Sequence, residues 1–237
     1  MELNAQKRMK TKPLSLCLLG AILAAASQSF GAEVRTSTGM IPGEPPDTLS
    51  PGWYISGLFR GNFIENTQLK QFGGPTTGTV KFDPGAGFSA RGGYRFCEWF
   101  ALEGEVGFEG NNISSITGAF VDAALYQVPY MANAVLTIPT RSLLIPYGGF
   151  GVGGTTSILD INDITIGTTT VFGSEARTTF AWQAFGGLDF NLNNRLSVGV
   201  MYNYRSVDGP KWDRSSFPIE FGDLHNHSVS ARVNYHF

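Results

Sequence analysis

The last ten residues of the chain, SVSARVNYHF (228–237), alternate strictly between apolar and polar side chains. The apolar set is Val229, Ala231, Val233, Tyr235 and Phe237, and the residues between them are serine, arginine, asparagine and histidine. A period of two is typical of a β-strand with one apolar face. Because chain ends are usually polar and frayed, such a terminus predicts a final strand that is held in place within a sheet.

Seven earlier segments have the same period: 53–63, 85–96, 99–108, 126–138, 143–154, 178–191 and 195–205. Residues 97–98, 139–142 and 192–194 are short enough for tight turns. The other connections are long and polar, and they cover 64–84, 109–125, 155–177 and 206–227. Long and short connections alternate, so we predict an eight-stranded antiparallel up-and-down meander with all its long loops at one end.

Alternation alone permits two barrels, a soluble one with apolar residues inside and a transmembrane one with apolar residues outside. Charged residues make up only 15% of the chain, well below the roughly 25% of a soluble domain. Lys70, Lys81 and Lys211 all fall in predicted loops, and the polar strand faces carry glycine, serine and asparagine beside a few arginines and acids. This pattern favours a transmembrane barrel with a small, polar, filled lumen.

Charged residues of the polar faces are predicted to form a network in the lumen. Arg91 and Arg95 on one strand lie across a tight turn from Glu103 and Glu105 on the next, so they are expected to pair directly. The predicted network consists of Arg91, Arg95, Glu103, Glu105, Asp189, Arg205 and Arg232. A charge facing lipid at mid-depth costs about 2–4 kcal/mol, which favours placing these groups inside.

Aromatic residues near strand ends on the apolar faces are predicted to form girdles at the two membrane interfaces. They are Trp53, Tyr94, Phe96, Phe100, Phe108, Tyr202 and Tyr204. Since lipid permits no open sheet edge, the last strand must also close against the first.

The N-terminus predicts export. Four basic residues within 7–12 precede a short apolar run (14–26) and small residues up to Ala32, as in a cleaved signal peptide. We therefore expect a signal peptide at 1–32, a flexible proline-rich periplasmic leader at 33–51 and the barrel at 52–237. Without residues 1–32 the net charge is about −5, which excludes nucleic acid as a partner. Cys97 is then the single cysteine, so no internal disulfide is expected.

These features resemble the eight-stranded outer-membrane β-barrel family of Gram-negative bacteria, which includes the OmpA transmembrane domain and the Opa adhesins. The resemblance rests on the signal peptide, GWYISGLF (52–59), GGYRF (92–96), FALEGEVGF (100–108) and the terminal VNYHF, and it covers 52–237. It implies an outer-membrane location. It also implies that Val229, Val233, Tyr235 and Phe237 form the signal read by the barrel-assembly machinery.

For function we expect a structural or surface-interaction protein that acts through its outer loops. The expected partners are outer-membrane lipid or lipopolysaccharide, the assembly machinery during biogenesis, and a host or environmental surface ligand. A low-conductance channel for small solutes or ions is the alternative, and a lipid A-modifying enzyme is a third hypothesis. No catalytic residues, metal or cofactor are predicted.

The enzyme reading rests on His225, His227 and Ser228, with Glu220 or Asp223 as the acid. Neighbouring residues of a strand point to opposite faces, so His227 and Ser228 are not expected to meet. His225 and His227 share a face, but no further metal ligand is evident near them.

Overall fold

The computed structural model describes residues 49–116, 122–140, 142–166, 169–214 and 217–237. Within these ranges all the regular secondary-structure elements are β-strands. No helix there is long and apolar enough to cross a membrane. The strands are β1 (Gly52–Ile64), β2 (Thr67–Phe72), β3 (Gly74–Phe82), β4 (Gly85–Cys97), β5 (Phe100–Ile116), β6 (Asp122–Thr137), β7 (Leu144–Ile166), β8 (Thr169–Asn191), β9 (Leu196–Val207), β10 (Lys211–Arg214), β11 (Phe217–Phe221) and β12 (Leu224–His236).

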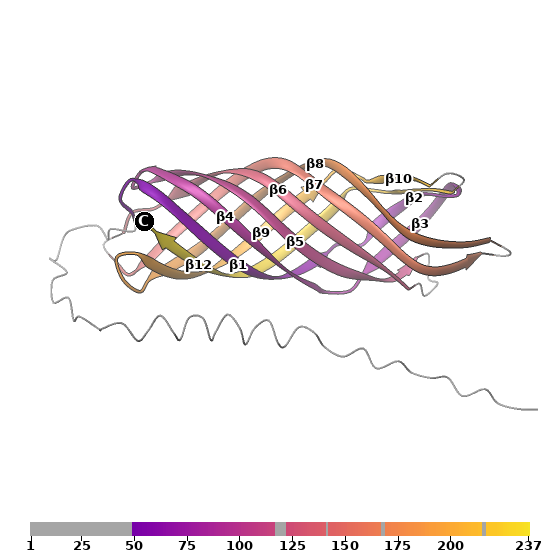
Figure 1. Ribbon diagram of the computed structural model, residues 1–237, viewed down its shortest axis with the longest axis horizontal. Coiled ribbons are helices and arrows are strands. Elements are labelled where there is room, and N and C mark those ends of the chain that lie inside the picture. Colours follow the sequence, from indigo (N-terminus) through magenta and orange to yellow (C-terminus); the bar gives the residue numbers. More distant parts are fainter. Residues whose placement is uncertain (1–48, 117–121, 141, 167–168, 215–216) are drawn as a thin grey trace, which may run out of the picture. The chain divides into compact units, whose positions relative to one another are not determined.

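Eight of these strands form a closed antiparallel ring (Figure 1). Neighbours around it are β1, β4, β5, β6, β7, β8, β9 and β12, and β12 pairs with β1. The eight-stranded barrel predicted from the alternation is therefore confirmed. Seven of the eight strand pairings around the ring join strands that are consecutive along the chain once the outer hairpins are set aside, as expected for an up-and-down meander.

The closing seam runs between the two ends of the barrel chain. β1 and β12 are paired from Tyr54↔His236 to Ile64↔Asn226 without a register shift. Beyond the last paired residue, the backbone N–H of Phe237 donates to the carbonyl of Trp53 at 3.1 Å. The chain terminus is ordered because it supplies one side of this seam.

The four long connections differ from the predicted loops. Residues 64–84 and 206–227 contain the hairpins β2–β3 and β10–β11, and β5–β6 and β7–β8 extend well beyond the predicted strand ends. The two hairpins pair with each other through β11 and β2, and β3 pairs with β5. The physical reason is pairing: threonine-rich segments that look like loops in isolation gain ladder partners when their neighbours extend beside them.

These hairpins also change the placement of the lysines. Lys70, Lys81 and Lys211 lie on β2, β3 and β10, not in loops. All three side chains are exposed on the outer end of the barrel.

The faces follow the predicted phase. Arg60, Arg91 and Glu105 are buried in the lumen, whereas Ile55 and Phe88 on the same strands are exposed on the outer wall. The outer wall is thus apolar and the inside is largely polar. This arrangement is the reverse of that in a soluble barrel.

The described part of the chain begins just before β1, at Leu49, which is fully buried at the end of the barrel where the short turns lie. The predicted signal peptide and all but the last residues of the predicted leader lie outside the described residues.

Candidate functional site

The centre of the lumen is organised around Glu105. Register places Arg91 of β4 directly opposite Glu105 of β5, and their side chains form an ion pair at 2.9 Å. Arg60 of β1 reaches the other carboxylate oxygen at 2.7 Å. Asn133 and Gln183 donate to the same carboxylate from β6 and β8 at 3.2 and 2.9 Å. One acid therefore connects five strands through side-chain contacts across the lumen.

A second acid, Glu103, lies one inward-facing position closer to the short-turn end. It pairs with Arg91 at 3.1 Å and with Arg232 of β12 at 2.7 Å. The hydroxyl of Tyr54 donates to it at 2.8 Å. Arg232 also lies 3.9 Å from Asp189 of β8. The network therefore crosses the seam between the last strand and the first.

A third acid, Glu109, lies on the outer side of the network. It pairs with Arg60 at 2.8 Å and with both terminal nitrogens of Arg205. Glu109 and Arg60 were not among the predicted network residues. The signal was available, because Arg60 lies on the polar face of the first strand and Glu109 has the phase of Glu103 and Glu105. The predicted third strand ended one residue too early to include Glu109.

Arg95 does not make the pair expected of it. Register sets it opposite Ala101, beyond Glu103, so its side chain points to the base of the lumen. There its guanidinium donates to the Thr137 hydroxyl at 3.1 Å and to the carbonyl of Glu98 at 3.2 Å.

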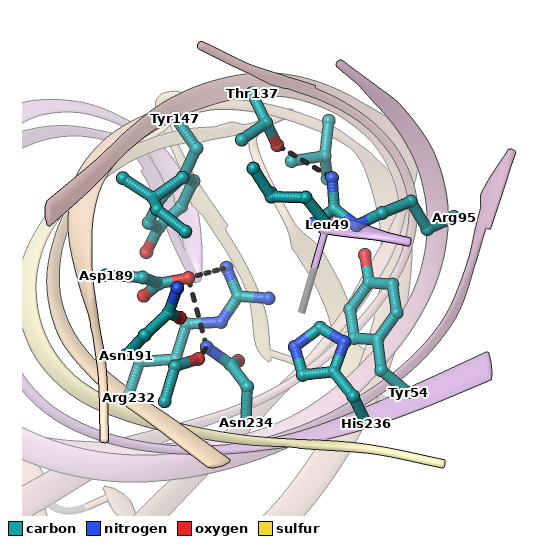
Figure 2. Close-up of a pocket in the computed structure, with 13 residues that line it drawn as sticks. Leu49, Tyr54, Arg95, Thr137, Tyr147, Asp189, Asn191, Arg232, Asn234 and His236 are labelled. Atoms are coloured by element: carbon teal, nitrogen blue, oxygen red, sulfur yellow. Dashed lines mark hydrogen bonds and ion pairs between the residues drawn. The ribbon is translucent and has the colours of Figure 1, made fainter. Parts of the chain in front are cut away.

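The base of the lumen holds a small cavity, which Figure 2 shows from the end. Its volume is about 20 Å³, enough for about one water molecule. Leu49 projects into it between Arg95 and Tyr54, and the Asp189 carboxylate faces Arg232 and Asn234 on the other side.

The outer part of the lumen holds a buried apolar cluster, which was not predicted from the sequence. Inward-facing side chains from the ring and from both outer hairpins pack into one buried cluster of sixteen residues: Ile64, Leu69, Val80, Ile113, Ile116, Ala123, Leu125, Met131, Leu159, Ile161, Ala181, Val207, Trp212, Ile219, Phe221 and Leu224. The Trp212 indole donates to the carbonyl of Ser157 at 3.2 Å, and its ring packs edge-on against Phe221 at 5.1 Å. The residues of β2, β3, β10 and β11 that fill this space lie in segments predicted to be loops.

The aromatic residues predicted at the interfaces all lie on the outer wall, and they divide between its two ends. Trp53, Tyr94, Phe96 and Phe100 form a row at the short-turn end, with ring centroids 5.0–5.9 Å apart from one to the next. Toward the other end, the Phe108 ring lies 6.1 Å from that of Phe88 and 5.7 Å from that of Tyr126. Tyr202 and Tyr204 lie on β9 beside two histidines of β12.

The four residues of the predicted assembly signal also face outward. Val229, Val233, Tyr235 and Phe237 are all exposed on β12 or just after it. The rings of Tyr235 and Phe237 pack edge-on at 5.3 Å.

The enzyme candidates are separated by the strand. The side chain of Ser228 is buried in the lumen. The side chain of His227 lies on the outer wall, where it pairs with Glu65 at 2.8 Å. Within the described ranges, no group of three histidine, cysteine or acidic side chains is placed to hold a metal ion.

A closed ring of eight antiparallel strands, apolar outside and charged inside, defines a transmembrane β-barrel. The sequence matches the family model described as the outer membrane protein beta-barrel domain over residues 14–237. The chain belongs to this family, and it is located in the outer membrane of a Gram-negative bacterium.

The solved structure of OprG gives the same fold, and two further solved structures match most of the chain. OprG of Pseudomonas aeruginosa is 16% identical, with a TM-score of 0.55 over 78% of this chain and 96% of its own. Neisserial surface protein A is also 16% identical, with a TM-score of 0.49 over 78% of this chain and 97% of its own. AlkL is 18% identical, with a TM-score of 0.48 over 79% of this chain and 90% of its own. No curated protein sequence matches the chain.

Proposed function

We propose that this protein is a closed outer-membrane barrel that acts through the surface of its outer end. The observation that carries the proposal is the filling of the lumen at two successive levels. Buried ion pairs around Glu105 occupy the middle, and the apolar cluster around Trp212 occupies the outer half.

The middle level opposes the passage of ions. The side chains of Arg60, Arg91 and Glu105 are fully buried and paired with one another. Breaking such a pair leaves an uncompensated buried charge, which costs about 3–5 kcal/mol. An ion would have to separate several of these pairs along its path.

The outer level opposes water and solutes for a different reason. Trp212 and Phe221 have no exposed surface, and close-packed apolar side chains leave no room for water. With passage disfavoured at both levels, the part of the molecule that is free to act is its outer surface. We expect that surface to contact the outer leaflet and a host or environmental ligand.

The proposal is tested by reconstituting the folded protein in planar bilayers and in liposomes. We expect no steady conductance steps and no swelling in sugars or amino acids, while an open porin in the same membranes gives both. Steady, protein-dependent single-channel steps would contradict the closed lumen and would support the low-conductance channel in its place.

A further inference from the structure

The outer wall carries a cluster of polar aromatic residues near the upper edge of its apolar band. Tyr202 and Tyr204 of β9 face His225 and His227 of β12. His225 lies ten residues from Tyr235 along β12, which corresponds to a height of about 25 Å for a strand tilted by about 40°. The apolar band of such barrels is also about 25 Å tall. Tyr235 lies at the short-turn edge of this band. One band height away, His225 therefore lies level with the lipid head groups of the outer leaflet.

The tyrosines fix how these histidines present their nitrogens. The Tyr204 hydroxyl lies 2.9 Å from Nδ1 of His225, and the two rings stack with 14° between their planes. A phenol that donates to Nδ1 favours the tautomer with its hydrogen on Nε2. Among the described residues no acceptor binds that Nε2, so a neutral His225 keeps one N–H available for a ligand. His227 differs, because its Nε2 contacts Glu65 at 2.8 Å.

His225 lines a groove of about 330 Å³ between β2 and the turn before β12. Asn66, Gln68, Lys70 and Asp223 also line it. Lys70 is exposed, and no carboxylate of the described chain lies within 4 Å of its ammonium group. The groove thus brings a free cation, an imidazole N–H and two amide side chains to one place.

Two acids lie close by, and both are engaged. Oδ1 of Asp223 accepts a hydrogen bond from the backbone N–H of Gly209 at 3.0 Å, and Glu65 contacts His227. The Asp223 carboxylate keeps its negative charge at one side of the groove, and Lys70, the amides and the imidazole supply the donors that can meet a ligand. Donors with a cation at this height suit a phosphate, since charge-assisted hydrogen bonds to phosphate oxygens are among the strongest in proteins.

We propose that this groove binds a phosphate group of the phosphorylated glycolipid in the outer leaflet. Lys70 and Nε2–H of His225 hold the phosphate oxygens, and Tyr204 is a positioning residue that orients His225. The lipid is favoured over a soluble phosphate because the groove lies directly above an apolar wall that can contact acyl chains. The proposal shares with the proposed function only the use of the outer surface, and it does not depend on a closed lumen.

Native mass spectrometry of the detergent-purified full barrel tests this site. The probes are bisphosphorylated lipid A, the same lipid without phosphates, and inorganic phosphate. We expect bound bisphosphorylated lipid, with about tenfold weaker binding in Lys70→Gln and in His225→Phe, which keeps the stacked ring. Lys81→Gln removes an exposed lysine of β3, the other strand of the same hairpin, which does not line the groove, and this variant should bind as the parent protein does. Tyr204→Phe should bind more weakly than the parent, with Lys70 unaltered.

Each variant is first checked for a folded barrel by heat-modifiable gel migration, so that loss of binding is not loss of fold. Equal binding of the phosphate-free lipid, or equal losses in Lys70→Gln and Lys81→Gln, would overturn the proposal. Binding of inorganic phosphate as tight as that of the lipid would show a free-anion site and would overturn the assignment to a lipid. None of these results bears on conductance, which tests the proposed function separately.

Discussion

The carboxylate of Glu105 is surrounded by two arginines and two amides, each from a different strand. Removing it by Glu105→Ala would leave the guanidinium groups of Arg60 and Arg91 buried with one acid fewer. We expect a loss of about 3–5 kcal/mol in the free energy of unfolding, measured by urea titration of the barrel in lipid vesicles.

Asp213→Asn is the matched control for Glu105→Ala. Asp213 also pairs with an arginine, Arg177, at 3.3 Å, but its side chain is 58% exposed. Exposed pairs contribute about 0–1 kcal/mol, so this variant should unfold close to the parent midpoint. A loss in Glu105→Ala no larger than that in Asp213→Asn would show that the central network does not stabilise the barrel.

Residue-level prediction succeeded where phase alone decides the outcome. Arg91 and Glu105 could be placed in the lumen because a two-residue period fixes the face of each side chain. The tight turn before β5 also predicted the pairing of Arg91 with Glu103 and Glu105. Partners on strands that are not joined by a short turn depend on register and on position along the barrel axis, which a local sequence pattern does not give. Arg95 shows the limit: its face was predicted, but its partners are the Thr137 hydroxyl and the main-chain carbonyl of Glu98, and not a glutamate carboxylate.

At the level of the elements, β12 closes the ring and is predicted to have a second role in assembly. Its backbone closes the ring against β1 up to Tyr54↔His236, while its outward side chains carry the predicted assembly signal. The two roles use different atoms and can be separated by mutation. Phe237 is 73% exposed, whereas its backbone N–H donates to the carbonyl of Trp53.

Phe237→Ala removes the ring and keeps this backbone hydrogen bond. We expect slower appearance of the heat-modifiable form in pulse-chase experiments in cells, with little change in the thermal stability of barrel refolded in detergent. Phe96→Ala is the control, because Phe96 is a 51% exposed aromatic at the same end but away from the terminus. If Phe96→Ala slows assembly as much as Phe237→Ala, the terminal residue is not a specific signal.

The strands of the ring were predicted well, and the outer hairpins were not. Each predicted strand carries its own two-residue period, which is a local signal. The hairpins β2–β3 and β10–β11 are short, and they are held by pairing with each other across more than a hundred residues of sequence. Their inward residues, such as Leu69 and Phe221, alternate over too few positions to be distinguished from a loop.

At the scale of the whole molecule, the lumen is filled by two successive layers that differ in chemistry, and we propose that both are barriers. The charged layer is held by ion pairs, and the outer cluster is held by apolar packing. Composition predicts the first, because the inward positions of the ring strands carry the charges. The second exists only because four outer segments, each predicted as a connection, assemble into an extension of the barrel wall.

If the charged layer and the apolar cluster act as barriers in series, as proposed, removing one of them leaves the lumen closed by the other. Arg60→Ala with Glu105→Ala removes an ion pair from the charged layer, and Trp212→Ala with Phe221→Ala removes the two large rings from the outer cluster. We expect neither double variant to give steady conductance in planar bilayers, and the combined fourfold variant to conduct small ions. Heat-modifiable gel migration first shows whether each of the two double variants and the fourfold variant has formed a folded barrel. Conductance of the first double variant equal to that of the fourfold variant would show that the apolar cluster is no barrier, and the charged layer would then be the single gate.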